Sequence, residues 1–439
     1  MALLVKGALI PGAWGREAAK GEGGVGAAGI AADFVADLLV EGDRITRIAP
    51  AIRAPSGAEV LEGAGRALVP SLVNGHAHSP MTLLRGVAED RELLPWLTEA
   101  IWPREARMTE EDIYWGLRLA ALEMVSTGTT VCNEMYLHPA ALARAAKDSG
   151  LRFMLSYALI DGLDEEVGRR QRADCEAFFA SLPDTGPLSS FGLAAHSVYA
   201  TCPDSIAFLA GLSKSRNLFL HVHLAETEVE DRDCRRLRGM SPARWLDELG
   251  ALGPRTVAAH CLWLDEADFD LLAERGVTVA HNPVSNMKLA SGPAFDYAGA
   301  RRRGIRVLYG TDGAASNNSL DLFSDLKVAA LLQKYHYRDP SRLPLSELLE
   351  GATVAGHELF GTGGGRIVEG AAADFVLVDL GRASMVPRHD LAANLVYAGG
   401  GAAVDTTVCA GKVLMRGRRI EGAEEVLAEA TERARRLKG

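Results

Sequence analysis

The sequence lacks the features that define several classes of protein. Its six cysteines include no CxxC pair, which argues against a disulfide framework or a thiolate zinc cluster. No run of about 20 apolar residues predicts a membrane span, and the N-terminus has no basic segment followed by a long apolar one. These absences favour a cytoplasmic protein in a reducing compartment, with no membrane partner.

Clusters of basic residues are also missing. The chain has 47 Lys and Arg residues against 57 Asp and Glu residues, a net charge of −10. This balance argues against nucleic acid or an anionic membrane surface as a partner. With 439 residues, 48% of them hydrophobic, the chain exceeds one ordinary domain and suits a large α/β barrel with additional segments.

Apolar runs that predict buried parallel strands alternate with amphipathic helical stretches through the middle of the chain. These runs are residues 68–74, 129–134, 152–160, 191–196, 218–224, 256–260, 277–281 and 305–309. Eight strand–helix units in roughly 300 residues predict a (β/α)8 TIM-like barrel. A doubly wound sheet usually carries a Gly-rich phosphate turn after its first strand, and this sequence has none.

The two ends of the chain contain short β-like runs of a different kind. These runs are residues 2–10, 34–48, 373–380 and 406–416. We expect residues 1–65 and 365–439 to meet as a small β-sandwich outside the barrel, with a charged helix at the C-terminus, while residues 66–364 form the barrel. The Gly/Ala-rich stretch 21–29 predicts a mobile hairpin tip.

Polar residues close the predicted barrel strands, at the edge where barrel enzymes build their sites. His76 and His78 close the first strand, and their i,i+2 spacing places both imidazoles on one face, where they can share a metal ion. His223 closes the fifth strand and Asp312 the eighth. Three nitrogens and one carboxylate oxygen suit Zn²⁺ or Fe²⁺ with an open position for water. The fourth strand has no lysine that could be carbamylated to bridge a second ion, so one ion is expected.

Each of these residues also has a purely structural interpretation. An isolated HxH pair, or His223 alone, could consist of buried packing residues, with His221 expected on the opposite side of the strand. Asp312 before Gly313 could belong to a turn or a helix cap. The recurrence of His or Asp at one strand end after another favours the metal site over these alternatives.

Four longer motifs carry a resemblance to a known family. They are NGHAHSPMTLLRG from Asn74, HLAET from His223, HNPVSNMKL from His281 and GTDGAASNN from Gly310. The sequence resembles the amidohydrolase superfamily over about residues 66–360, and more loosely towards both ends. Within it, the sequence is most similar to the branch of methylthioadenosine/S-adenosylhomocysteine deaminases and chlorohydrolases. The resemblance implies a metal-dependent hydrolase. Its metal ion, expected to be zinc rather than iron, would be bound by His76, His78, His223 and Asp312.

The resemblance also implies roles in catalysis and substrate binding. Asp312 would accept a proton from the attacking water, Glu226 would protonate a ring nitrogen, and His260 would hydrogen-bond the attacking oxygen. Glu105 matches a carboxylate that holds ribose hydroxyls, and His196 matches a histidine that faces the substrate. Glu226 also has a plainer interpretation, as part of a solvated acidic helix start.

Two further residues bear on the 5′ end of the expected substrate. Arg169 matches an arginine near the 5′ substituent. Tyr157 stands where the S-adenosylhomocysteine-binding pattern has an arginine, and the loss of a guanidinium removes a bidentate partner for a carboxylate. This difference favours a methylthio, deoxy or aromatic 5′ substituent. His281 is expected to support the site indirectly or to orient the loop after it.

The expected function is metal-dependent hydrolytic deamination of a 5′-modified adenine nucleoside, which releases ammonia and the inosine analogue. Candidate substrates are 5′-methylthioadenosine, S-adenosylhomocysteine, 5′-deoxyadenosine and aminofutalosine. The alternatives are a deaminase or dechlorinase of another ring, such as guanine, a pterin or a triazine, and a non-catalytic scaffold with the same barrel. The resemblance also implies a homo-oligomer, either a dimer or a tetramer.

Overall fold

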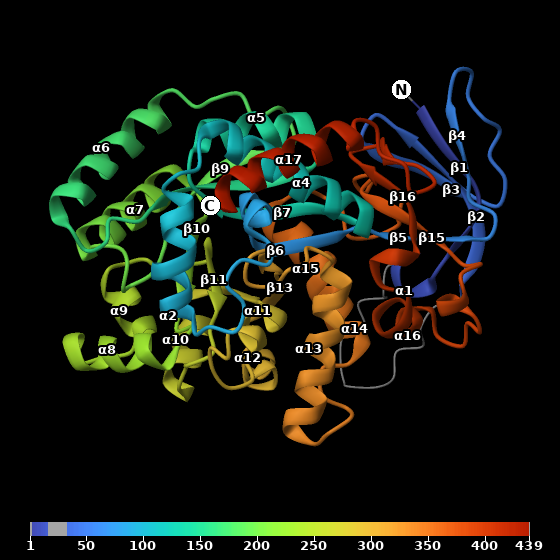
Figure 1. Cartoon of the computed structure of the whole chain (residues 1–439). Coiled ribbons are helices and arrows are strands. Elements are labelled where there is room, and N and C mark those ends of the chain that lie inside the picture. Colours follow the sequence, from blue (N-terminus) through green and yellow to red (C-terminus); the bar gives the residue numbers. More distant parts are fainter. Residues whose placement is uncertain (1, 16–32, 439) are drawn as a thin grey trace.

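The computed structural model describes residues 2–15 and 33–438, which form two sheets with helices packed around them (Figure 1). The stretch 21–29, expected to be a hairpin tip, lies outside the described residues. Within the described ranges, every helix is too short or too polar to cross a membrane. The structure describes all six cysteines, and each is buried and free.

Nine parallel strands form the larger sheet, in the order β13-β12-β11-β10-β9-β8-β7-β6-β14. They are β6 (Leu72–His78), β7 (Thr129–Tyr136), β8 (Arg152–Leu159), β9 (Ser190–Ala195), β10 (Leu220–Leu224), β11 (Thr256–His260), β12 (Thr278–His281), β13 (Arg306–Tyr309) and β14 (Asp312–Gly313). Strand β14 follows β13 almost directly and pairs with β6, with Asp312 opposite Ala77. The ring therefore closes, which confirms the predicted TIM-like barrel.

Helices cover the outside of the barrel and bury the outer faces of its strands. They are α4 (Glu110–Thr127), α5 (Pro139–Ser149), α6 (Glu165–Ala180), α7 (Pro203–Arg216), α8 (Glu228–Arg238), α9 (Pro242–Glu248), α10 (Glu266–Arg275), α11 (Pro283–Lys288), α12 (Tyr297–Arg302), α13 (Leu322–Tyr337), α14 (Leu345–Ala352) and α15 (Val354–Phe360). Helix α4 shows how particular residues determine where a helix begins and ends. Thr109 and Asp112 form a capping box at its start, and Gly128 ends it with a φ of 93°, which leads directly into β7.

The long connection between β6 and α4 contains four short helical segments. They are η1 (Ser79–Leu84), α2 (Leu93–Trp96), η2 (Leu97–Ile101) and α3 (Trp102–Glu105). Because parallel barrel strands end at the same face, this connection begins at the face where the polar strand ends lie. It therefore supplies additional side chains to that face.

The first barrel strand differs from its predicted range, 68–74. Leu68 and Pro70 belong to β5 (Arg66–Pro70) of the smaller sheet, while β6 begins at Leu72. Between them, the N–H of Ser71 donates to the carbonyl of Asp374 at 3.2 Å. One apolar run thus crosses from one sheet into the other, and periodicity does not reveal this because both strands are buried.

The smaller sheet is built from both ends of the chain, in the order β17-β16-β15-β5-β1-β2-β3, with β4 paired to β1. Its strands are β1 (Ala2–Ile10), β2 (Phe34–Glu41), β3 (Arg44–Ala49), β4 (Glu59–Glu62), β5, β15 (Phe375–Asp379), β16 (Val404–Cys409) and β17 (Lys412–Met415). The two ends meet where β5 pairs antiparallel with β15. The small β domain beside the barrel is therefore built from both ends of the chain, as predicted. Its N-terminal part continues to Pro70, the last residue of β5.

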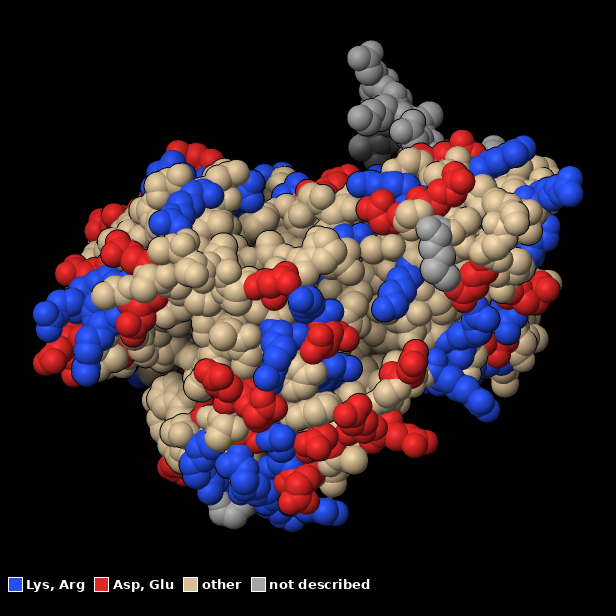
Figure 2. Space-filling model, turned by 90° about the horizontal axis from the view of Figure 1, so that it is seen from above, with Lys and Arg blue, Asp and Glu red and all other residues tan. Residues whose placement is uncertain are grey.

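The remaining elements lie between strands of the smaller sheet or follow its last strand. They are α1 (Gly12–Gly15), η3 (Ala383–Met385), α16 (Leu391–Asn394), η4 (Leu395–Gly399), η5 (Gly400–Ala403) and α17 (Ala423–Lys438). The charged helix α17 packs against α4, where Arg433 pairs with Asp112 at 3.4 Å. On the face shown in Figure 2, acidic and basic side chains are interspersed, and exposed pairs of this kind each contribute little to stability.

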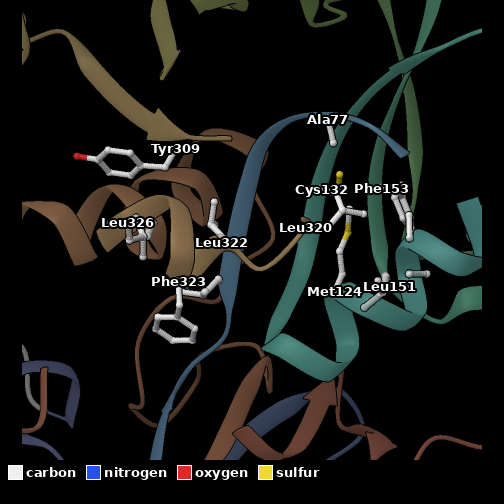
Figure 3. Packing of buried hydrophobic residues seen from close by; sticks show 14 of the residues in the cluster. Ala77, Met124, Cys132, Leu151, Phe153, Tyr309, Leu320, Leu322, Phe323 and Leu326 are labelled. Carbon is white, nitrogen blue, oxygen red and sulfur yellow. The ribbon is translucent and has the colours of Figure 1, made fainter. Parts of the chain in front are cut away.

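One apolar cluster extends through the barrel wall and its helices. Figure 3 shows members of it on both sides of β6, with Met124 and Cys132 on one side and Leu322 and Phe323 on the other. All four side chains are buried. Close packing of this kind gives the strand ends a rigid base, so residues that follow the strands are held in place.

Candidate metal and active site

Three barrel strands bring the predicted metal ligands together. His76 and His78 lie on β6, His223 on β10 and Asp312 on β14. Oδ1 of Asp312 is 3.2 Å from Nε2 of His76 and 3.3 Å from Nε2 of His78. Nε2 of His78 is 3.1 Å from Nε2 of His223. Four donor atoms therefore surround one small volume.

The hydrogen bonds of the imidazoles leave Nε2 free to bind a metal ion. Nδ1 of His78 lies 2.6 Å from the carbonyl of Met135, and Nδ1 of His223 lies 2.8 Å from the carbonyl of His196. Because a carbonyl only accepts, the hydrogen is on Nδ1 in both rings. Nε2 of His76 is buried and makes no hydrogen bond to any described residue. Nitrogen and carboxylate donors in this arrangement fit a divalent ion such as zinc.

His260 on β11 lies close to the same donors. One ring nitrogen each of His76, His223 and His260 lie within 4.8 Å of one another. Nδ1 of His260 is 2.7 Å from Nδ2 of Asn286. Because an amide NH₂ donates, this Nδ1 accepts, and the hydrogen lies on Nε2. Burial lowers the pKa of His260 to about 3, so the ring is neutral and offers Nε2–H as a donor.

His221 contacts the metal ligands although sequence analysis placed it on the opposite side of the strand. Its Nε2 is 2.9 Å from Nδ1 of His76, and the side chain is buried. His221 and His223 are two residues apart on β10, so they share a face of the strand. The i,i+2 rule that paired His76 with His78 could have identified it.

Replacing His221 tests whether it orients the His76 ring. We expect His221→Ala to lower metal affinity about 10- to 100-fold, as for other residues that hold a metal ligand in place. His221→Gln keeps a side-chain acceptor and should lower the affinity less. Metal retention against a series of chelator concentrations measures both variants. Equal affinity in both variants and the parent protein would contradict this role.

Glu226 follows β10 at the mouth of the barrel. Its Oε2 is 3.8 Å from Nε2 of His260, and its Oε1 accepts a hydrogen bond from the Ser291 hydroxyl at 3.4 Å. Burial raises the pKa of Glu226 well above its usual value, and the nearby carboxylates of Asp312 and Glu230 raise it further. Burial therefore favours the protonated form of this side chain, which is the form that can donate a proton.

Glu230 holds the turn that carries Glu226. Its carboxylate accepts hydrogen bonds from the N–H groups of Ala225 at 3.0 Å and of Glu226 at 2.9 Å. Ala225 has a φ of 49°, in the left-handed region that side chains other than glycine rarely adopt. Burial raises the pKa of Glu230 to about 7. Glu226 and Glu230 are each only 4% exposed. The interpretation of residues 226–231 as a solvated acidic start of a helix is therefore wrong for these two side chains.

Helix α11, which follows β12, orients two residues of the site. Hydroxyls of Ser285 and Ser316 donate to Oδ2 of Asp312 at 2.6 Å and 3.2 Å, which leaves Oδ1 directed at the histidines. Asn286 of the same helix holds His260. His281 is buried, its nitrogens have no partner among the described residues, and its ring centroid is 5.0 Å from that of Phe295. The HNPVSN motif therefore contacts the site through Ser285 and Asn286.

A cavity opens over these residues. Its lining includes His196, which follows β9, and Glu105 of α3. The Tyr136 hydroxyl donates to Glu105 at 2.5 Å. Burial raises the pKa of Glu105, and this hydrogen bond opposes the rise.

Two residues predicted to bind substrate lie away from the cavity. Ala158 of β8 lines it, whereas Tyr157 turns to the other side, where its ring centroid is 5.0 Å from that of Phe178 on α6. Successive residues of a strand face opposite sides. Arg169 is exposed on α6 and is not among the described residues that line the cavity. Sequence analysis inferred a preference for a methylthio, deoxy or aromatic 5′ substituent from Tyr157, which stands in place of an arginine. That inference therefore has no structural support.

Known proteins resemble the chain over most of its length. Residues 67–414 match the amidohydrolase family. The chain is 45% identical to a 5′-deoxyadenosine deaminase of Methanoregula boonei over 86% of each chain. It is 40% identical to 5-methylthioadenosine/S-adenosylhomocysteine deaminase 1 of Archaeoglobus fulgidus, over 92% of this chain and 95% of the relative. A solved adenosine deaminase from Xanthomonas campestris with bound zinc has a TM-score of 0.88 and 32% identity, covering 99% of this chain and 98% of that one.

Proposed function

The chain belongs to the amidohydrolase family, and we propose that it is a metal-dependent deaminase of 5′-modified adenine nucleosides. The products would be ammonia and the corresponding inosine analogue. The relatives described above, which are named for 5′-deoxyadenosine, 5-methylthioadenosine and S-adenosylhomocysteine, support this substrate class. The observation that carries the proposal is the buried Glu226, 3.8 Å from His260, beside the four converging donor atoms.

The proposal includes one divalent metal ion per subunit, bound by His76, His78, His223 and Asp312. We expect zinc, with iron as the alternative. When bound there, a divalent ion lowers the pKa of a water molecule towards 7 and so supplies a nucleophile. The solved adenosine deaminase from Xanthomonas campestris contains bound zinc. The set of three imidazoles and one carboxylate suits the same ion.

The positions of three side chains support the following catalytic roles. Asp312 would accept a proton from the attacking water at Oδ1. Glu226 would give its proton to the ring nitrogen next to C6, which makes that carbon accept the water oxygen. Nε2–H of His260 would donate a hydrogen bond to this oxygen as C6 becomes tetrahedral. Asp312 would then pass its proton to the amino group, the C6–N bond would break and ammonia would leave. The proton on the C6 oxygen would go to Glu226, which restores this acid and leaves the carbonyl of the inosine analogue.

Substrate binding is assigned to residues that line the same cavity. Glu105 would accept hydrogen bonds from the ribose hydroxyls, because its side chain reaches the cavity and only one of its oxygens is bonded to Tyr136. His196 would face the substrate beside His223, from which its ring centroid is 4.6 Å away. A homo-oligomeric state, expected from the resemblance, and a cytoplasmic location, expected from the cysteine pattern, are part of the same proposal.

A substrate comparison tests the proposed function. Zinc-loaded protein should deaminate 5′-deoxyadenosine and 5′-methylthioadenosine with a higher kcat/KM than guanine, a pterin or a chlorotriazine. Purine absorbance and ammonia or chloride release measure the reactions. Turnover of only the free bases or the triazine would contradict the nucleoside assignment. Absence of any turnover in the zinc-loaded protein would favour the non-catalytic scaffold.

A further inference from the structure

The backbone that carries the two histidines of β6 is not held by a regular ladder of hydrogen bonds. Strand β6 pairs Asn74 with Cys132 of β7, and Ala77 with Glu134. Three steps along β6 therefore match two steps along β7, as in a β-bulge. Such an irregularity leaves backbone groups without ladder partners, so other groups of β7 are needed to hold this stretch.

Two buried side chains of β7 form hydrogen bonds with this backbone. Nδ2 of Asn133 donates to the carbonyl of Gly75 at 3.0 Å. The carboxyl oxygens of Glu134 both accept from the N–H of Ser79, at 3.0 Å and 2.9 Å. Neither side chain is more than 2% exposed. The two contacts lie just before and just after the part of β6 that contains the histidines.

Ser79 needs a hydrogen-bond partner from outside its own segment. It is the first residue of η1, and the first N–H groups of a helix have no partner within that helix. The preceding residue, His78, makes no side-chain cap bond, since its imidazole faces the other donor atoms of the site. The next residue is Pro80, which has no N–H. Glu134 therefore satisfies the N–H group that lies directly beside a metal ligand.

Glu134 is fully buried, and among residues 2–15 and 33–438 its only hydrogen-bond partner is Ser79. A buried carboxyl group with one partner is unfavourable for folding, so packing does not explain its presence. Burial raises the pKa of Glu134 to about 8, and a carboxyl group accepts a hydrogen bond in either protonation state. The contact therefore depends on where the oxygen lies and does not need a negative charge.

The same part of β7 also holds the imidazole of His78. Its Nδ1 lies 2.6 Å from the carbonyl of Met135, which directly follows Glu134. One contact fixes the ring, and the other fixes the backbone just after it. Together they determine where Nε2 of His78 points. If the contact with Ser79 is lost, the end of β6 can shift while the ring contact stays in place.

We propose that Glu134 is a positioning residue for the metal ligand His78, and that it acts by accepting the hydrogen bond of the Ser79 N–H. This inference rests on the metal site of the proposed function. It adds to that site a side chain that is not among the described lining of the active-site cavity. The expected effect of its loss is therefore on metal binding and not on the binding of substrate.

Two replacements of similar length test the acceptor. Glu134→Met removes it and should lower zinc affinity about 10- to 100-fold, as for other residues that hold a metal ligand in place. Glu134→Gln keeps an oxygen within reach of the Ser79 N–H and should stay within about threefold of the parent. Zinc retention against a series of chelator concentrations measures both without any turnover. Zinc should also raise the melting temperature less in Glu134→Met than in the parent.

The matched control is Tyr136→Phe. It removes a side-chain hydrogen bond of the same strand, but one that leads to Glu105 and not to β6. Its zinc affinity should equal that of the parent. At saturating zinc, the KM of Glu134→Met for 5′-deoxyadenosine should also equal that of the parent, because position 134 does not line the cavity. Glu134→Leu, which also lacks an acceptor, serves if Glu134→Met does not fold.

Four results would overturn this role of Glu134 and leave the proposed function intact. They are unchanged zinc affinity in the variants without an acceptor, an equal loss in Glu134→Gln, an equal loss in Tyr136→Phe, and failure of both Met and Leu variants to fold while Glu134→Gln folds. The last result would assign the hydrogen bond to folding. A parent protein that binds no divalent ion, or deaminates no nucleoside when loaded with zinc, would instead contradict the proposed function.

Discussion

Glu226→Gln should lower the kcat for 5′-deoxyadenosine about 10²- to 10⁴-fold, the usual contribution of a general acid or base. Glutamine has nearly the same shape as glutamate, but its amide does not release a proton at neutral pH. The metal content should equal that of the parent, because Glu226 is not one of the four converging donors. Steady-state kinetics together with metal analysis measures both quantities.

The pH dependence of the same variant separates proton donation from a structural role. Burial, Asp312 and Glu230 raise the pKa of Glu226, so the parent is active while this group is protonated. Its rate should fall as the pH rises through that pKa, and Glu226→Gln should lack this decline. Ser291→Ala, which removes only the hydrogen bond to Glu226, should cost about 2- to 10-fold. Full activity of Glu226→Gln would refute the assignment.

Asp312→Asn should abolish turnover, with a loss of about 10⁴-fold or more, because it removes a metal ligand and a proton acceptor together. The amide keeps the volume of the carboxylate but carries no negative charge to attract a divalent ion or to accept a proton. Metal content should fall with activity. Measurements at increasing zinc concentrations separate weaker metal binding from the loss of the proton acceptor, since added zinc restores only occupancy.

Ser285→Ala is the matched control for Asp312→Asn. It removes one hydrogen bond to Oδ2 and leaves Oδ1 facing His76 and His78. We expect a loss of about tenfold or less, in keeping with one hydrogen bond to a charged group. Retained activity in Asp312→Asn would exclude Asp312 as the proton acceptor. Two ions per subunit in the parent protein would exclude the mononuclear site.

Local patterns in the sequence were enough to predict the barrel and to select the residues that converge in it. His76 and His78 share a face because they are two residues apart on a strand, and the same rule applies wherever the strand lies in the fold. His223 and Asp312 follow apolar runs, and parallel strands end at the same face of a barrel. These inferences needed only the spacing of residues within single elements.

Contacts between distant elements were not predictable in this way. Glu230 and Asn286 orient the site, yet nothing in their local sequence distinguishes them from packing or capping residues. Tyr157 shows the reverse case, because a position matched to the family pattern turns its ring towards α6 and away from the cavity. Which face of β8 lines the cavity depends on how the whole barrel closes.

The sequence by itself determined the alternation of strands and helices, the joining of both chain ends beside the barrel, and the residues that close the strands. Only the tertiary structure decided which donor atoms meet and which groups are buried enough for their pKa to change. The physical reason is that hydrophobic periodicity acts over a few residues. Burial and convergence arise when strands far apart in the chain, such as β14 and β6, pair with each other.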